Sequence, residues 1–373
     1  SESRPRAAGR VAQRIGRTLN SLNQPIQDWV THNNLLLDIM LHPLIVPFWQ
    51  RYINFKGNTR QSLGDLVGYL RTRQKKGAER PIFAFLNLME THLPYGPPAR
   101  FVRRFVPYYH SDRQARSFMQ SYNYETYRWI TPITEPFSEL EDHVLNDMYD
   151  AEVAFEDHLL RQLFEYLDQP EIRDNTLVIL MADHGEGVNH HDYVGHSLVT
   201  YNDLVHVPLI LRYPRLYPEE KRISTPVSTR RVFHTALEAA GVSPTNAQTT
   251  AEDLRNLSLM RSLNGSDPEQ GIVFAEAFPQ KTLLALMENK APKVIAAFRC
   301  RATRRAIFSS SLDSYKLITV DNQPEELFDV STDPPELCNL ISEQPQIASA
   351  LEGLLKSEIA KAEARCPTTL PPL

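Results

Sequence analysis

The stretch that most constrains the fold is an apolar run followed at once by a polar loop. Residues Leu177 to Met181 are continuously apolar and lie between polar residues, as expected of a strand buried on both faces of a parallel sheet. Asp183 and His184 follow directly. Because ligands of open α/β sheets bind beyond the carboxyl ends of the strands, we expect the chemistry of this chain to lie here.

The loop after this run is rich in groups that bind metals or move protons. Asp183 and His184 place a carboxylate beside an imidazole, just before a glycine that lets the backbone turn, and this is half of a divalent-metal site. His190, His191 and His196 follow within the same short stretch, and histidines gather where metals, protons and anions are handled. Two simpler interpretations stay open, namely a helix cap at Asp183 and a solvated histidine-rich loop.

Apolar runs alternate with long helical patterns in the first two thirds of the chain. Asp142 to Leu167 has apolar residues at helical spacing, as has Leu63 to Arg73. This alternation predicts an α/β/α sandwich with a mainly parallel mixed sheet. We expect that sheet to include Phe83 to Met89, Leu177 to Met181 and Val207 to Leu211.

The last hundred residues have a different pattern of apolar residues. Short apolar runs at hairpin spacing precede a helical pattern from Pro345 to Ala364. We therefore predict a main α/β domain over residues 1–265 and a small antiparallel subdomain with one helix over residues 266–373. The runs expected to form its strands are Ile272 to Ala277, Leu283 to Met287, Val294 to Arg299, Arg305 to Phe308 and Lys316 to Val320.

Composition excludes some partners. The formal net charge is −5 and the sequence pI is about 6.2, so we expect no nucleic-acid or anionic-membrane partner. No apolar run reaches the length of a transmembrane segment. The three cysteines are odd in number and lack metal spacing, which argues against a disulfide framework and slightly favours the cytoplasm. Nothing in the sequence indicates the oligomeric state.

Three segments in order resemble conserved motifs of the sulfatase family, in the alkaline-phosphatase-like superfamily. The resemblance extends from about Leu66 to the C-terminal helix, and it implies the fold described above with its antiparallel C-terminal subdomain. The matching segments are His92 to Tyr95 for the substrate histidine, Asp183 to Glu186 with Gly195, His196 and Val207 to Ile210 for the metal and leaving group, and Glu325 to Leu340 for the C-terminal motif.

The resemblance also implies roles for individual residues. Asp183 and His184 would be ligands of a divalent metal, Ca²⁺ or Mn²⁺, with the imidazole tilting the choice towards manganese or zinc. His92 would contact the sulfate oxygens, and His196 would be the catalytic proton donor to the leaving alkoxide. His191 is a weaker substrate-binding candidate that either lines the pocket or holds the loop. The implied substrate is a small-molecule or glycan sulfate ester.

Glu186 is as suited to capping the following turn as to acting in catalysis.

The chain departs from the family pattern at two motifs. Sulfatases carry a nucleophile in Cys-or-Ser-x-Pro-x-Arg, converted to formylglycine, and a preceding strand that ends in paired aspartates. Neither motif is present here. We therefore expect an N-terminally truncated chain with an exposed apolar sheet edge, weak metal binding and no turnover of sulfate esters.

Two alternatives to a sulfatase remain. Many sulfatases have Asp-Asn where this chain has Asp183-His184, and Asp-His is common in the related phosphonate and phosphodiester hydrolases, which are the second interpretation. A non-catalytic remnant is the third. An upstream Cys-x-Pro-x-Arg would favour the sulfatase. A threonine or serine nucleophile outside that context would favour the second reading, and absence of any upstream partner would favour the third.

Overall fold

The computed structural model describes residues 56–77, 80–124, 132, 135–242, 256–263, 265–312 and 314–365. The sequence pattern also predicts short helices over Leu19 to Phe55, a short helix over Thr249 to Leu263, and an aromatic rim of the active site that includes Tyr122, Tyr127 and Trp129. The first of these, the start of the second, Tyr127 and Trp129 lie outside the described ranges. Within the described ranges, no helix combines the length and apolar character that crossing a bilayer requires.

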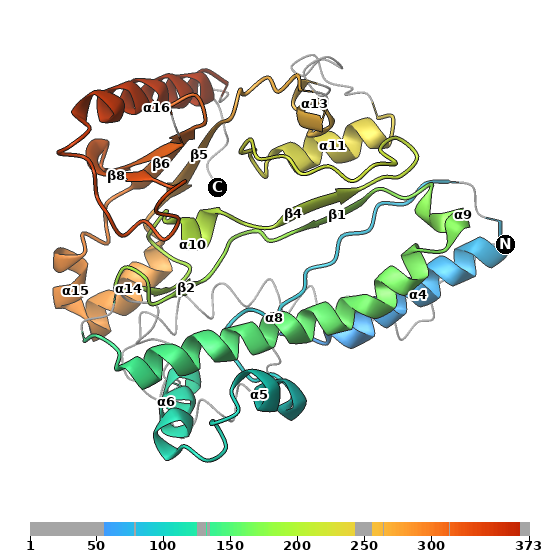
Figure 1. Cartoon of the computed structure of the whole chain (residues 1–373), viewed down its shortest axis with the longest axis horizontal. Helices are drawn as coiled ribbons and strands as arrows, with labels where there is room; N and C mark the ends of the chain where they lie inside the picture. Colours follow the sequence, from blue (N-terminus) through green and yellow to red (C-terminus); the bar gives the residue numbers. More distant parts are fainter. Residues whose placement is uncertain are drawn as a thin grey trace.

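Two long helices form one layer of the molecule (Figure 1). Helix α8 (Glu139–Leu167) begins with a capping box, in which the Glu141 carboxylate accepts from the backbone N–H of Ser138 at 2.9 Å. Helix α4 (Thr59–Lys75) lies beside it. Their contact is made by buried apolar side chains, Leu63 and Val67 of α4 with Leu159 and Leu163 of α8. Both helices were predicted from their apolar periodicity, and both are confirmed.

The first half of α8 carries a second core. Helices α5 (Ala99–Phe105) and α6 (Arg113–Tyr124) pack against it, around Val144, Met148 and the stacked rings of Tyr95 and Tyr122. The aromatic stretch that includes Tyr122 was expected to form the rim of the active site. Tyr122 is instead fully buried, because its ring fills the space between α6 and α8.

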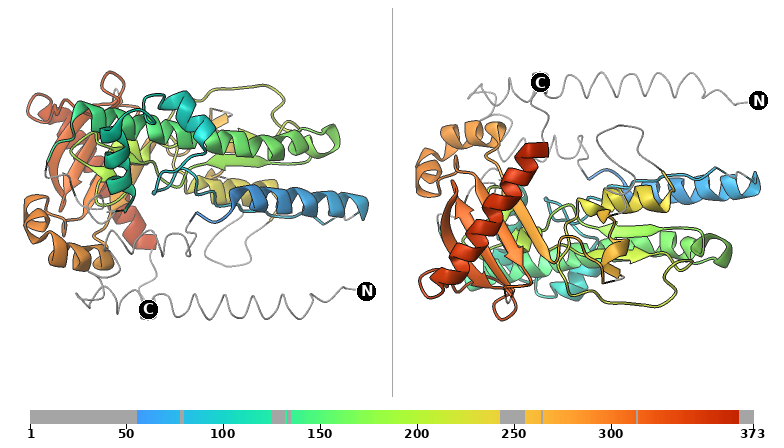
Figure 2. Two further views of the ribbon diagram at one scale, coloured as in Figure 1. Left: turned by 90° about the horizontal axis from the view of Figure 1, so that it is seen from below. Right: turned by 90° about the horizontal axis from the view of Figure 1, so that it is seen from above.

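A short sheet lies between two helical layers. Strand β1 (Val178–Met181) follows α8 and the single turn α9 (Pro170–Arg173), and it pairs antiparallel with β4 (Leu209–Arg212). Helices α4 and α8 cover one side of this sheet, and α11 (Arg231–Ala239) with α13 (Met260–Leu263) lies on the other (Figures 1 and 2). The loop between the strands contains β2 (Gly187–Val188), β3 (Val194–Gly195) and α10 (Asn202–Val205).

The α/β class is confirmed, but every strand pair among the described residues is antiparallel. The predicted strand from Phe83 to Met89 is assigned no sheet partner in those residues. Leu86 and Leu88 pack on the α4 and α8 core, whereas Phe83 is 82% exposed and Phe85 is 79% exposed. An apolar run sets the tendency to form a strand but does not choose its neighbours, so the mainly parallel pairing stays a prediction.

The C-terminal part of the chain forms its own sheet. Strands β5 (Ile272–Ala277), β6 (Arg304–Ser309), β7 (Tyr315–Val320) and β8 (Gln323–Asp329) pair antiparallel in that order. Helix α16 (Pro345–Arg365) covers one face and buries Leu351 against Leu317 and Leu327. An antiparallel sheet with one covering helix is what the sequence predicted for this part, whereas the division of the chain after residue 265 stays a prediction.

Two of the strands expected in this part are helices. Leu283 to Met287 lies in α14 (Lys281–Lys290), and Val294 to Arg299 falls largely in α15 (Pro292–Ala297). Leu283 and Met287 are four residues apart and both are buried, which is the spacing of one helix face rather than of a strand. A short apolar run is ambiguous between the two structures, and here the prediction was wrong.

Candidate active site

The loop after β1 is held by a close backbone contact. The N–H of Gly185 donates to the carbonyl of Leu204 in α10 at 2.8 Å. A Cβ on Gly185 would lie only 1.9 Å from the carbonyl oxygen of Asp203. Glycine is therefore the residue that allows α10 to approach the loop this closely. This contact fixes the backbone next to Asp183 and His184.

Three of the predicted site residues come together. The ring centroids of His184 and His196 are 4.5 Å apart, with the rings nearly stacked. His92 lies 4.9 Å from His196, measured between ring centroids, although the two residues are more than a hundred positions apart in the chain. We call His92, His184 and His196 the histidine cluster. It joins the segment after residues 83–89 to the loop after β1.

Each ring of the histidine cluster is anchored through the same nitrogen. Nδ1 of His92 donates to the carbonyl of Leu93 at 2.7 Å, and Nδ1 of His184 donates to the carbonyl of Gly185 at 2.8 Å. In His196, Nδ1 lies 3.1 Å from Oε1 of Glu186. A carbonyl only accepts, so Nδ1 carries the proton in the first two rings. Nε2 is thereby left to meet a ligand in all three.

Glu186 is the residue whose role the sequence left undecided. Its side chain is buried, and its hydrogen bond raises the pKa of His196. Burial raises the pKa of nearby Tyr149 to about 12, and the negative charge of Glu186 adds to that effect. Such a carboxylate fixes the orientation of its imidazole and favours the imidazolium form. The only sequence signal for Glu186 is its position in the segment from Asp183 to Glu186, which resembles a family motif.

Asp183 and His184 present donors that suit a divalent metal. Asp183 is largely exposed, and its Oδ2 atom lies 3.8 Å from Nε2 of His184. The Nδ1 bond of His184 to a carbonyl is the usual arrangement of a metal-binding imidazole. Among the described residues, no group of three or more histidine, cysteine or carboxylate side chains is placed to hold a metal. The donor types of the pair suit a divalent metal, and the described residues do not supply a third ligand.

His191 lies apart from the histidine cluster. Its Nε2 is 2.9 Å from the carbonyl oxygen of Pro335, and its ring stacks on Tyr201 with centroids 3.7 Å apart. Of the two roles that the sequence left open, these contacts favour holding the loop over lining the pocket. His190 pairs with Asp203 through Nδ1 at 2.7 Å, and this bond raises the pKa of His190.

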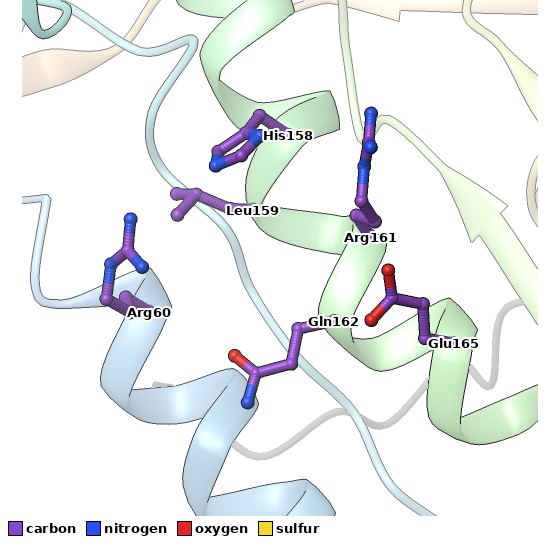
Figure 3. A pocket seen from close by; sticks show the side chains of 6 residues that line it. All are labelled: Arg60, His158, Leu159, Arg161, Gln162 and Glu165. Carbon is purple, nitrogen blue, oxygen red and sulfur yellow. The ribbon is translucent and has the colours of Figure 1, made fainter.

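Two hollows lie on α8, and the histidine cluster lines neither of them. One is a cavity of about 130 Å³ where Arg60 of α4 faces His158, Gln162 and neighbouring side chains of α8 (Figure 3). The other, of about 510 Å³, lies between α5 and α8 and includes Phe101 and Val153. Arginines and carboxylates are mixed in both, so neither selects a ligand by charge.

Comparison with known proteins gives consistent matches. A family model described as Sulfatase matches residues 16–242. "Uncharacterized sulfatase YidJ" of Escherichia coli (strain K12) is 27% identical over 173 residues, which are 46% of this chain and 34% of that protein. Arylsulfatase K of Mus musculus is 28% identical over 231 residues, which are 60% of this chain and 37% of that protein. The chain thus spans about a third of the length of these relatives.

The fold resembles solved structures over most of the chain. The crystal structure of phosphonate monoester hydrolase of Agrobacterium radiobacter superposes with a TM-score of 0.56 at 19% sequence identity. The match covers 83% of this chain and 61% of that one. At this level of identity the likeness concerns the fold alone.

Proposed function

Because this chain belongs to the sulfatase family, whose model matches more than half of it, we propose that the histidine cluster is the leaving-group and metal side of a site that hydrolyses sulfate esters. The observation that carries the proposal is the common anchoring of His92, His184 and His196 through Nδ1. The ring centroids of His92 and His184 lie 4.9 and 4.5 Å from that of His196, so this group of imidazoles can serve an anion and a leaving oxygen at once.

Each side chain has a chemical task in this proposal. Asp183 and His184 would hold Mn²⁺ or Ca²⁺, which supplies positive charge to the oxygens of the sulfate. His92 directs Nε2 to a sulfate oxygen, where a charge-assisted hydrogen bond from the ring to the anion is of the stronger kind. His196 carries the proton for the departing alkoxide on Nε2, while Glu186 stabilises the imidazolium through Nδ1.

The proposal extends to the sheet and to the substrate. We take the sheet of the complete site to be mixed and mainly parallel, with residues 83–89 as one strand. The exposed rings of Phe83 and Phe85 support this, because large apolar side chains on a strand-like run are usually covered by a neighbouring element. The substrate class is a small-molecule or glycan sulfate ester, and a formylglycine nucleophile would have to come from outside these 373 residues, which lack its motif.

A phosphonate or phosphodiester hydrolase is the second candidate. It is favoured by His184, which stands where many sulfatases have asparagine, since an imidazole ligand suits a transition metal better than calcium. Sulfate and phosphate esters present similar anionic oxygens to the same cations. Comparing turnover of an aryl sulfate with that of an aryl phosphonate, each with Mn²⁺ and with Ca²⁺, separates the two activities.

We expect weak Mn²⁺ binding that depends on Asp183. An Asp183→Asn variant should bind Mn²⁺ at least about 10-fold more weakly, because it loses the charged ligand. Asp192→Asn is the matched control, since Asp192 is exposed on the same loop and its backbone φ of +51° suits asparagine. Titration followed by the electron paramagnetic resonance of free Mn²⁺ measures both. Binding unaffected by Asp183→Asn would contradict the assigned ligand and favour a non-catalytic remnant.

We also expect this chain not to turn over sulfate esters such as an aryl sulfate. Without the covalent nucleophile, His92 and His196 can assist only a positioned water, so most of the acceleration is missing. A His196→Ala variant measured in parallel identifies the contribution of the histidine cluster. Robust release that disappears in His196→Ala would show that a nucleophile lies within these residues, outside the family's motif.

A further inference from the structure

A buried ion pair lies in the C-terminal subdomain, outside the histidine cluster. Nζ of Lys316, on β7, is 2.7 Å from Oε1 of Glu336, in the segment after β8. The two side chains are 3% and 0% exposed. Burial lowers the pKa of Lys316, and the charge of Glu336 opposes that shift. Desolvating two charges is costly, and a buried ion pair is weak evidence for stability in itself.

Both members of the pair bind the same residue of α10. The other oxygen of Glu336, Oε2, accepts from the backbone N–H of Asn202 at 2.6 Å. Lys316 donates through Nζ to Oδ1 of Asn202 at 3.0 Å. The side-chain amide of Asn202 in turn donates to the carbonyl of Pro334 at 3.2 Å. The first residue of α10 is thus held by three directional bonds from the C-terminal subdomain.

Helix α10 is also the element that contacts the site loop. Gly185 donates its N–H to Leu204, and its Cα faces the carbonyl of Asp203 without room for a side chain. Asp203 accepts from Nδ1 of His190 in the same loop. Contacts therefore run continuously from Glu336 through α10 to Gly185, the residue next to His184.

The same C-terminal segment holds the loop at a second point. The carbonyl of Pro335 accepts from Nε2 of His191, whose ring stacks on Tyr201. The hydroxyl of Tyr201 donates to the carboxylate of Glu326 on β8 at 3.0 Å. Residues 334–336 and β8 thus contact the loop at His191 and Tyr201, and residues 334–336 also contact α10 itself at Asn202.

We propose that Lys316 and Glu336 are positioning residues, which set α10 and through it the loop that carries Asp183 and His184. The part of this inference that concerns metal affinity rests on the proposed function. The geometric part does not, because it concerns the bond from Gly185 to Leu204. Bonds from a charged pair fix both the direction and the place of α10, whereas apolar side chains of similar volume would fill the space without directing the Asn202 backbone.

The test replaces both charges at once by side chains of similar volume. A Lys316→Met/Glu336→Leu double variant leaves no unpaired buried charge, so it avoids the penalty that either single change would impose. Arg305→Met/Glu276→Leu is the matched control, since it removes another ion pair from the same sheet, between β6 and β5. Circular dichroism on both variants first establishes that the fold is retained.

Hydrogen exchange at the Gly185 amide tests the geometric part. We expect this amide to exchange at least about 10-fold faster in the Lys316→Met/Glu336→Leu variant and at the original rate in the control, because only the first releases α10. An unchanged rate in the folded double variant would overturn the proposal. If the double variant does not fold, Lys316→Gln/Glu336→Gln takes its place, since it also leaves no unpaired buried charge and keeps an acceptor for the backbone N–H of Asn202. Faster exchange in this variant would support the charges as the positioning element, and an unchanged rate would overturn that role.

Mn²⁺ affinity provides the second readout. We expect the Lys316→Met/Glu336→Leu variant to bind Mn²⁺ roughly 10-fold more weakly, as is typical when groups behind a metal ligand are lost. Faster exchange at Gly185 with unchanged Mn²⁺ affinity would overturn the extension to the metal. If the unmodified chain binds no Mn²⁺, the proposed function fails, and the exchange rate alone decides the positioning role.

Discussion

An Arg231→Met variant is expected to lose about 3–5 kcal/mol of stability, the usual cost of breaking a buried ion pair. Arg231 is fully buried in α11. Its guanidinium donates to Asp267 at 2.9 Å and to the carbonyls of Leu257 and Ser258 at 3.0 Å. Methionine fills similar space but leaves these acceptors without their donor. Urea unfolding followed by circular dichroism measures the change in midpoint.

An exposed arginine provides the control for Arg231. Arg301 pairs with Glu288 at the surface, where both side chains are about half exposed. Arg301→Met should therefore change stability by less than about 1 kcal/mol. Equal effects of the two substitutions would contradict the role assigned to the buried guanidinium.

A Gly185→Ala variant is expected to disrupt the site loop. Its Cβ would meet the carbonyl carbon and oxygen of Asp203 and the Cα of Leu204. All three are backbone atoms, so neither a rotamer change nor a side-chain shift relieves the clash. Overpacking of this kind costs about 1–3 kcal/mol. The Mn²⁺ affinity should fall together with the stability, because the displaced backbone lies next to His184.

Substitution by alanine is expected to raise the stability at another glycine, Gly68. Gly68 lies within α4, and a Cβ added there meets nothing within 4 Å. Gly68→Ala should stabilise the chain by about 0.5–1 kcal/mol through helix propensity. Thermal unfolding of the two alanine variants side by side tests both signs. A neutral Gly185→Ala would mean that α10 is free to move away from the loop.

Local sequence pattern predicted the elements better than their partners. The run before Asp183 and the periodicity of α8 were sufficient to locate β1 and the long helix. The convergence of His92 with His184 followed from motif resemblance, and the structure places their ring centroids 4.9 and 4.5 Å from that of His196. The run from Leu283 to Met287 was misassigned because its length suits a strand as well as a helix turn.

The undecided residues depended on distant contacts. Glu186 could not be distinguished from a turn cap, because its burial and its bond to His196 exist only in the folded chain. The role of His191 depended on Pro335, 144 positions away. Nothing near either residue in the sequence encodes these partners. Local pattern and motif resemblance therefore pointed to the residues of the histidine cluster but not to the groups that hold them.

The exposed segment from Pro81 to Asn87 has a practical consequence for every measurement on this chain. Within the described residues its backbone has no sheet partner, and Phe83 and Phe85 face solvent. Such a segment is a template to which a strand of another molecule can add. Self-association should therefore grow with protein concentration, and light scattering should rise before turbidity appears. Metal titrations and unfolding curves then describe the single molecule only in dilute samples.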